Sequence, residues 1–385
     1  GMSAGLRASG FEVIAGADIE RNYMNSFRHN FPNAKPLLLD LAETNASDFM
    51  EIVGIKPGKL DLLVGGPPCQ GFSKNVPRRN RYLDDPNNRL MRSFLDYCEA
   101  LHPTAILMEN VAEMKNGFDQ AYSDEVIGRL DKLGYTVSHA VLNAADYGVP
   151  QKRRRAFFLA MTRGVPVEFP LRSHSASSGV KQLFELPKQV TVWDAIGDLP
   201  SIKNGEGTDP SEYASEPFSE FQKIVRKNRD RVSNHVARQL KAVQFERLAA
   251  LKPGQGLKHL PPHLKVRSGY SGAYGRLTED MIAPTITRWV FHPGSGRWGH
   301  PRDIRVLTIR EAARIQGFPD DFEFVGSYTQ NAGQVGNAVP PLLIERLASK
   351  ISIQLGYADA RRNELASTSP RQRAAQGIRP VPLIS

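Results

Sequence analysis

A cysteine that follows two glycines and two prolines is the residue of this 385-residue chain best suited to covalent chemistry. Cys69 lies in the stretch DLLVGGPPCQGFS (61–73), directly after an apolar run typical of a buried strand. The prolines stiffen the loop, and the glycines let the backbone approach a ligand closely. A thiolate there can act as a nucleophile where positive charge or N–H groups lower its pKa. A free cysteine is more often a small buried residue, which we expect for Cys98 on an apolar helix face.

A carboxylate and a basic run also follow or precede predicted strands, so they are candidates for the same site as Cys69. Glu109 closes the apolar run PTAILMEN, and the basic run QKRRR (151–155) leads into RRAFFLAMT. Ligands of parallel α/β sheets bind beyond the carboxyl ends of the strands, so we expect Cys69 and Glu109 to share that edge. Taken alone, Glu109 is equally compatible with a surface carboxylate, and the basic run with a solvated surface.

Composition excludes several classes of protein. Lys and Arg number 50 against 40 for Asp and Glu, and the resulting net charge of +10 suits a polyanionic partner. The chain contains no apolar run long enough to span a membrane and no signal-peptide pattern. Its two cysteines make neither a disulfide framework nor a four-cysteine zinc site. We therefore expect no metal, and a reducing cytoplasmic setting.

Strand-like and helix-like stretches alternate up to residue 164. We expect strands at 11–19, 35–41, 61–66, 103–110, 135–144 and 154–162, and helices at 20–31, 88–102 and 122–133. This alternation predicts an α/β fold with a doubly wound, mostly parallel sheet.

Periodicity is weak over 165–302, which predicts a smaller, irregular and partly β domain. From 303 to 357 we expect a return to the first domain, with Thr308 and Glu311 forming a capping box. The Arg-, Ser- and Pro-rich tail, 358–385, is predicted to be disordered.

Five ordered motifs resemble those of the DNA (cytosine-5) methyltransferases of the bacterial restriction–modification type. They are GGPPCQGFS, MENV, YGVPQKRRRAFFLA, APTITRWVFHPGSGRWGHPRDIRVLTIREAARIQGFP and QVGNAVPP, and the resemblance covers about residues 1–355. It implies a Rossmann-like domain that transfers a methyl group from S-adenosylmethionine to C5 of a flipped-out cytosine, with 165–302 recognising the target. It further implies a covalent bond from Cys69 to C6, hydrogen bonds that join Glu109 with N3 and with the exocyclic amine, an Arg155 contact to the C2 carbonyl, and a supporting role for Arg153.

The same resemblance implies residues that bind the cofactor. They are Asp18, Ile19, Asp40, Pro68, Leu90, Asn337 and Val339. Asp18 suits the ribose hydroxyls and Asp40 the adenine amine, although either carboxylate also suits a helix N-cap. The chain opens with GMSAGLRASGF, which fits the end of the family's glycine loop and the helix after it. We therefore expect the family's first strand to be missing and a gap in the middle of the sheet.

The predicted DNA contacts form two groups. The first follows the nucleophile and comprises Ser73, Lys74, Arg78, Arg79, Arg81 and Arg89. The second lies in the target-recognition region and comprises Lys265, Arg267, Arg276, Thr287 and Arg288. Arg and Lys can hold phosphates or read guanine, but each residue of the second group is also compatible with a purely structural role.

The expected partner is double-stranded DNA, bound by a monomer associated with the bacterial nucleoid, while a cognate restriction endonuclease acts separately. Two alternatives stay open. One is an RNA cytosine-5 methyltransferase, since one branch of the family methylates transfer RNA, but the large region after residue 165 favours DNA. The other is a truncated, non-catalytic DNA-binding remnant, which the missing glycine loop favours. Calorimetry with S-adenosylmethionine distinguishes the remnant from an enzyme, because a remnant should not bind it.

Overall fold

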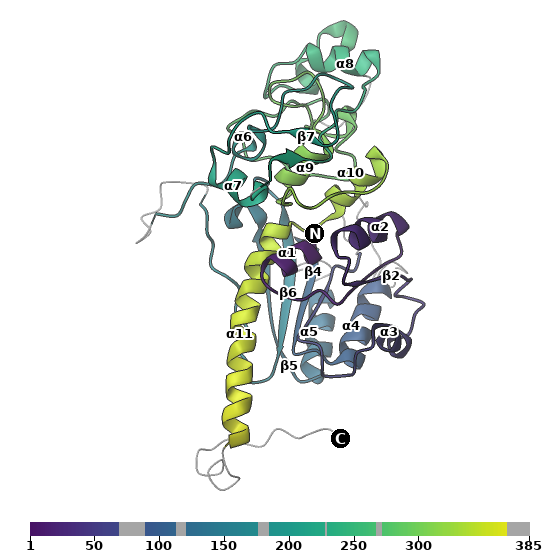
Figure 1. Ribbon diagram of the computed structural model, residues 1–385, viewed down its shortest axis with the longest axis vertical. Helices are drawn as coiled ribbons and strands as arrows, with labels where there is room; N and C mark the ends of the chain where they lie inside the picture. The colour runs from purple at the N-terminus through teal and green to yellow at the C-terminus, as the bar shows by residue number, and fades with distance from the viewer. Residues whose placement is uncertain (69–88, 113–120, 176–184, 228, 267–271, 368–385) are drawn as a thin grey trace.

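The computed structural model describes residues 1–68, 89–112, 121–175, 185–227, 229–266 and 272–367, with the backbone alone described for 357–367. Figure 1 shows two parts. Strands β1 to β6 and helices α2 to α5 form the lower part, helices α6 to α10 lie in the upper part, and the long α11 runs down beside the sheet.

Every strand and helix expected in the first part is present, with bounds within a few residues of the prediction. The strands are β1 (Ala15–Asp18), β2 (Lys35–Leu38), β3 (Leu62–Gly65), β4 (Ala105–Val111), β5 (Tyr135–Asn143) and β6 (Arg154–Thr162). The helices are α1 (Met2–Ala8), α2 (Arg21–Asn30), α3 (Ala46–Val53), α4 (Arg89–Leu101) and α5 (Ala121–Lys132).

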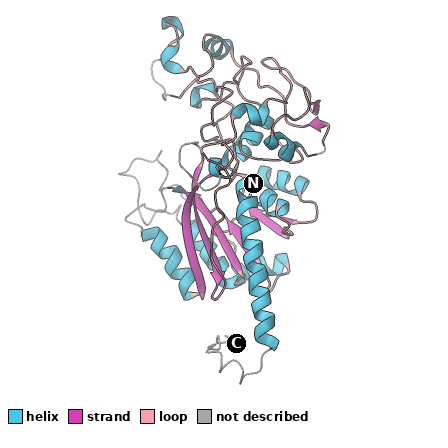
Figure 2. Ribbon diagram, turned by 90° about the vertical axis from the view of Figure 1, so that its left-hand side faces the viewer, coloured by secondary structure: helices cyan, strands magenta, loops and turns pink. Residues whose placement is uncertain are grey.

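The strands form two sheets, and the α/β class is confirmed. One sheet has the order β3-β4-β6-β5, visible side by side in Figure 2, and β1 pairs with β2 in parallel. Strand β3 is parallel to β4, whereas β6 is antiparallel to both β4 and β5. Only the short segment 144–153, with the 3₁₀ helix η6 (Ala144–Tyr147), joins β5 to β6, and a connection this short permits only an antiparallel return. Within the described residues no ladder joins β1 to β3, so the expected gap in the sheet is present.

Strand β4 forms the centre of the core. Its side chains alternate between faces, so that Ile106 and Met108 join the cluster under α4 and α5 while Leu107 joins a larger cluster shared with the C-terminal helices. Cys98 is fully buried in the first cluster, and burial raises the pKa of its thiol. This confirms that Cys98 is a core residue.

The described part of 165–302 is irregular, as expected, with short elements. These are α6 (Val192–Ile196), β7 (Ser211–Glu212), α7 (Glu220–Arg226), β8 (Arg231–Val232), α8 (Ala242–Ala249) and the 3₁₀ helices η7 (Leu257–His259), η8 (Pro262–Leu264) and η9 (Pro293–Ser295). Its β content is small: β7 and β8 form an antiparallel pair of two residues each.

Three helices follow: α9 (Ile309–Ile315), α10 (Tyr328–Asn337) and α11 (Pro341–Ser367). The predicted capping box of α9 is confirmed, because Glu311 N donates to Thr308 Oγ1 at 3.1 Å and Thr308 N donates to Glu311 Oε2 at 2.8 Å. The prediction of disorder from residue 358 is wrong up to Ser367, where α11 ends. The stretch ADARRNELA is rich in strong helix formers, so α11 continues through it.

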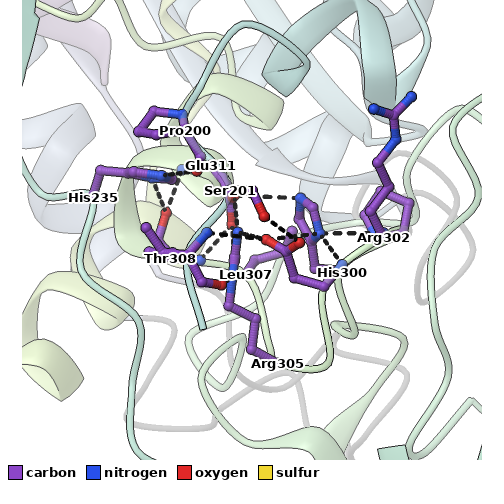
Figure 3. A network of polar contacts seen from close by, with 12 residues as sticks. Pro200, Ser201, His235, His300, Arg302, Arg305, Leu307, Thr308 and Glu311 are labelled. Carbon is purple, nitrogen blue, oxygen red and sulfur yellow. Dashed lines mark hydrogen bonds and ion pairs between the residues drawn. The ribbon is translucent and has the colours of Figure 1, made fainter. Parts of the chain in front are cut away.

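A buried polar network connects Ser201 and the segment 303–305 to α9 (Figure 3). Arg305 makes two hydrogen bonds to the Glu311 carboxylate, at 2.7 and 2.8 Å, and a third at 2.9 Å to Asp303. Asp303 in turn accepts from Ser201 Oγ at 2.7 Å. Burial alone would raise the pKa of Glu311, but the charge and hydrogen bonds of Arg305 outweigh it and hold that pKa well below its usual range. Loss of either ionic partner would leave an uncompensated buried charge.

In the part of the chain that the structure describes, no helix has the length and apolar character needed to cross a bilayer. The described residues also contain no cluster of His, Cys, Asp and Glu able to hold a metal ion.

Candidate active site

The parallel pairing of β3 and β4 brings the Gly66–Pro67 turn next to Glu109. Gly65, the last residue of β3, lies opposite Met108, so Gly66 leaves β3 beside Glu109, which stays in β4 two residues before its end. A Cβ atom on Gly66 would lie 3.2 Å from Glu109 Oε2. Asn110 Nδ2 donates to the Pro67 carbonyl at 3.0 Å and thereby holds the start of the turn. Cys69 itself lies outside the described residues.

Glu109 and Arg155 form the ionic pair of the site. Arg155 Nε lies 2.9 Å from Glu109 Oε1, across the antiparallel ladder between β4 and β6. Glu109 is 9% exposed, and burial raises the pKa of its carboxyl, while Arg155 and Arg153 oppose the rise. A carboxyl held this way binds a proton more readily than a surface glutamate, so it can donate a hydrogen bond. The structure thus brings together two of the predicted catalytic residues.

Arg153 points into the protein interior. Its Nη1 donates to the Ile286 carbonyl at 3.0 Å and its Nη2 to the Gly336 carbonyl at 3.2 Å. Its Nε is buried and has no hydrogen-bond partner among the described residues. Arg153 therefore ties the start of β6 to Ile286 and to the end of α10, which fits the predicted supporting role.

Gln151 is a site residue that the sequence reasoning missed. It is fully buried, accepts from Ile286 N at 2.8 Å, and donates to the Ile315 carbonyl at 3.3 Å and to Gln316 Oε1. Gln316 in turn donates to the Ala338 carbonyl. Together the two glutamines join the segment before β6 to Ile286, to the end of α9 and to Ala338 just beyond α10. The only signal in the sequence was a glutamine directly before the basic run.

Of the predicted cofactor residues, Asp18 is the last residue of β1, and Asp40 lies two residues beyond the end of its partner strand β2. Asp18 Oδ1 accepts from Glu20 N at 2.9 Å, and Asp40 Oδ1 accepts from Ala42 N at 2.9 Å. Neither caps a helix, because the N-cap of α2 is Glu20 and that of α3 is Asn45. The alternative role as N-caps is therefore wrong.

A carboxylate has two acceptor oxygens, so Asp18 can accept from a ligand in addition to the Glu20 N–H. Burial, the largest cause, raises the pKa of its carboxyl, and the backbone N–H groups of Glu20 and Ile19 oppose the rise. Ile19 beside it is 64% exposed, an unusual exposure for a large apolar side chain. An acceptor next to an open apolar surface suits a nucleoside.

The other predicted cofactor residues lie in different surroundings. Asn337 is exposed at the end of α10, and its Nδ2 donates to Tyr23 Oη at 2.7 Å. Val339 is buried, Leu90 is half-buried and Pro68 is exposed. Tyr23 carried no signal in the sequence, because its partner lies 314 positions away.

The recognition segment Thr287–Trp289 is fixed against the catalytic part. Thr287 and Arg288 are exposed, and the Arg288 guanidinium lies 5.4 Å from the centroid of the Trp289 ring. A Cβ atom on Gly336 would lie 2.2 Å from Thr287 C and from Arg288 N, so only glycine allows α10 to approach this segment so closely. Lys265, another predicted DNA contact, is exposed as well.

One predicted DNA contact, Arg276, is buried in the structure, and another, Arg89, already pairs with other residues of the chain. Arg276 is 6% exposed, and its guanidinium donates to the carbonyls of Leu251, His300, Pro301, Arg302 and Asp303. It holds the fold of the recognition region and is not available to DNA, so that prediction is wrong. Arg89 is exposed, but it pairs with Glu43 at 2.9 Å and with the Ala42 carbonyl at 3.0 Å, beside the Asp40 turn. The remaining predicted DNA residues, Ser73, Lys74, Arg78, Arg79, Arg81 and Arg267, lie outside the described residues.

Comparison with known proteins agrees with this geometry. The family model for C-5 cytosine-specific DNA methylases matches residues 1–353, and the chain belongs to that family. Its enzyme class is DNA (cytosine-5) methyltransferase, with relatives among bacterial type II methyltransferases.

Two of those relatives cover most of the chain. Type II methyltransferase M1.HphI of Haemophilus parahaemolyticus is 33% identical over 91% of this chain and 83% of its own length. M.AgeI of Thalassovita gelatinovora is 29% identical over 92% of this chain and 97% of its own. Among solved structures, a prophage-encoded DNA modification methyltransferase of E. coli is similar with a TM-score of 0.71 and 25% identity, over 92% of this chain and 96% of that one. The fold also resembles that of the Entamoeba histolytica methyltransferase EhMeth, with a TM-score of 0.58 and 16% identity over 91% and 95% of the two chains.

Proposed function

We propose that this protein transfers a methyl group from S-adenosylmethionine to C5 of a flipped-out cytosine in a specific duplex DNA sequence, through a covalent bond between Cys69 and C6. The observation that carries the proposal is the buried Glu109–Arg155 pair, held beside the Gly66–Pro67 turn that leads to Cys69. These described residues support a role for a carboxyl and a cation in binding the base that Cys69 attacks.

Each residue has a defined task in this mechanism. C5 of cytosine is a poor nucleophile, but addition of the Cys69 thiolate to C6 forms an S–C bond and pushes the C5–C6 electron pair onto the ring. Burial raises the pKa of Glu109 against the opposing charges of Arg155 and Arg153; in its protonated form Glu109 donates to N3 and balances the charge that develops there. Arg155 donates to the C2 carbonyl oxygen. After methylation, loss of the C5 proton to a base expels Cys69 as a thiolate and restores the aromatic ring.

The described residues fit S-adenosylmethionine, which supplies the methyl group as an electrophile. The Asp18 carboxylate would accept from the ribose hydroxyls, and Ile19 would offer an apolar surface to the adenine. Asp40, at the end of the neighbouring strand, accepts from the adenine amine. Asn337, Val339, Leu90 and Pro68 complete the proposed cofactor contacts.

Duplex DNA is the proposed substrate. A cytosine must leave the stack to reach Cys69, at a cost of about a few kcal/mol. The exposed Thr287 and Arg288, locked to the catalytic part through Arg153 and Gly336, form a rigid edge that contacts the DNA. Lys265 and the basic residues of segment 73–89 hold phosphates. We further propose that the enzyme acts as a monomer and protects DNA from a separate endonuclease; the type II methyltransferase names of its relatives support a role in DNA modification.

Bisulfite sequencing of DNA from a host that carries the gene tests the proposal. We expect methylated cytosines at one recurring sequence, and none with the Cys69→Ala variant. Methylation that persists in Cys69→Ala would refute the covalent mechanism. Bisulfite sequencing of the host's transfer RNA in parallel tests the RNA alternative, which predicts modification there instead of in DNA.

A further inference from the structure

The hydroxyl of Tyr23 lies between the cofactor residues of two distant chain segments. Tyr23 belongs to the first turn of α2, which begins at Arg21, three residues after Asp18. Its Oη accepts from Asn337 Nδ2 at 2.7 Å, although 314 positions separate the two residues. Helix α10 lies directly over the hydroxyl, since a Cβ atom on Gly333 would be 3.8 Å from Tyr23 Oη.

This hydrogen bond fixes the direction of an otherwise free side chain. Asn337 is exposed, and its bond to Tyr23 is the only one that its carboxamide makes within the described residues. Nδ2 is engaged with Tyr23, so Oδ1 remains available as an acceptor. Burial raises the pKa of Tyr23, so its hydroxyl stays protonated at neutral pH and does not become a charge in the site.

The hydrogen bond to Tyr23 favours ligand binding because it already restricts the Asn337 side chain in the free protein, so that less side-chain conformational entropy is lost when the ligand binds. A solvent-exposed asparagine samples several rotamers, and immobilising it upon binding costs affinity. Tyr23 is itself half-buried in the helix that follows Asp18. One bond therefore sets the Asn337 side chain relative to the Asp18 side of the site.

From this juxtaposition we propose that Tyr23 is a positioning residue for cofactor binding: its hydroxyl holds the Asn337 carboxamide so that Oδ1 faces the site of S-adenosylmethionine. This inference rests on the proposed function and assigns to Tyr23 a role that acts through Asn337.

Calorimetric titration with S-adenosylhomocysteine tests the inference without a requirement for activity. We expect Tyr23→Phe to raise the Kd about fivefold, the usual effect of one neutral hydrogen bond. Tyr135→Phe is the matched control, because Tyr135 Oη donates to the Pro103 carbonyl at 2.6 Å, at the opposite edge of the sheet. It should leave the Kd unchanged.

A double-mutant cycle separates positioning from a direct contact of Tyr23 with the ligand. If Tyr23 acts through Asn337, then Tyr23→Phe combined with Asn337→Ala should bind no more weakly than Asn337→Ala alone. A double variant whose loss equals the product of the two single losses would overturn the inference, as would an unchanged Kd in Tyr23→Phe. A wild-type protein that binds no S-adenosylhomocysteine would instead overturn the proposed function itself, and this inference with it.

Discussion

Replacing Gln151 by leucine keeps the approximate volume of the side chain and removes its hydrogen bonds. The change leaves Ile286 N and Gln316 Oε1 buried without this partner, and the Ile315 carbonyl loses a donor. An unsatisfied buried polar group costs about 1–3 kcal/mol, so two such groups predict a loss of roughly 2–6 kcal/mol. That is a large part of the about 5–15 kcal/mol by which domains are usually stable.

Urea unfolding followed by tryptophan fluorescence measures this loss. The control is Gln255→Leu, which removes a single hydrogen bond from Lys252 N at 2.9 Å near the surface. Its expected cost is within about 1 kcal/mol, since water can satisfy the freed group. If both variants unfold at the same urea concentration with equal slopes, the buried hydrogen bonds of Gln151 do not contribute the predicted stability.

Three further predictions concern charge. Glu109→Gln should lower kcat by about 100-fold and remove the decline in rate that accompanies deprotonation of Glu109 as the pH rises through its raised pKa; a persistent decline in the variant would assign it to another group. Arg288→Ala should weaken DNA binding and reduce the salt dependence by about one released ion without loss of stability, whereas Arg276→Ala should destabilise the fold by roughly 3 kcal/mol; the reverse pattern would exchange their roles. Burial lowers the pKa of His300 to about 4, so His300 stays neutral in the folded protein, and its contribution to the free energy of unfolding is present above pH 6.5 and is lost as the pH falls toward 4. His300→Gln should therefore lose on the order of 2 kcal/mol less stability than the wild type between pH 7 and pH 5. Identical urea unfolding curves for both proteins at both pH values would contradict this.

Local sequence signals were sufficient to predict most strands and helices up to residue 164 and to predict that β3 and β4 end at the same edge of the sheet. Apolar runs and helical periodicity located the strands and helices of the first part, and the capping box at Thr308 located the start of α9. The direction of β6 was not accessible in the same way, because a buried strand has the same apolar pattern in either direction. The end of α11 was misjudged because Arg, Ser and Pro in the tail masked a stretch of good helix formers.

Roles that depend on distant partners could not be read from the sequence. Arg276 stands among glycines and aromatic residues, which is typical of a DNA-reading loop, yet carbonyls at 251 and 300–303 surround its guanidinium. Gln151 and Tyr23 likewise gain their meaning from residues more than 100 positions away. Glu109 and Arg155 were found because each stands at the end of a strand within a recognisable motif.

The most direct test of the covalent mechanism uses a duplex that contains the methylated sequence with 5-fluorocytosine at the target position. Fluorine at C5 cannot leave as a proton does, so the covalent intermediate accumulates when S-adenosylmethionine is present. Mass spectrometry of the digested complex should then find the oligonucleotide on the peptide that contains Cys69, and no adduct with Cys69→Ser. No adduct at Cys69 in the wild-type protein, or an adduct on the peptide of Cys98, would contradict the account.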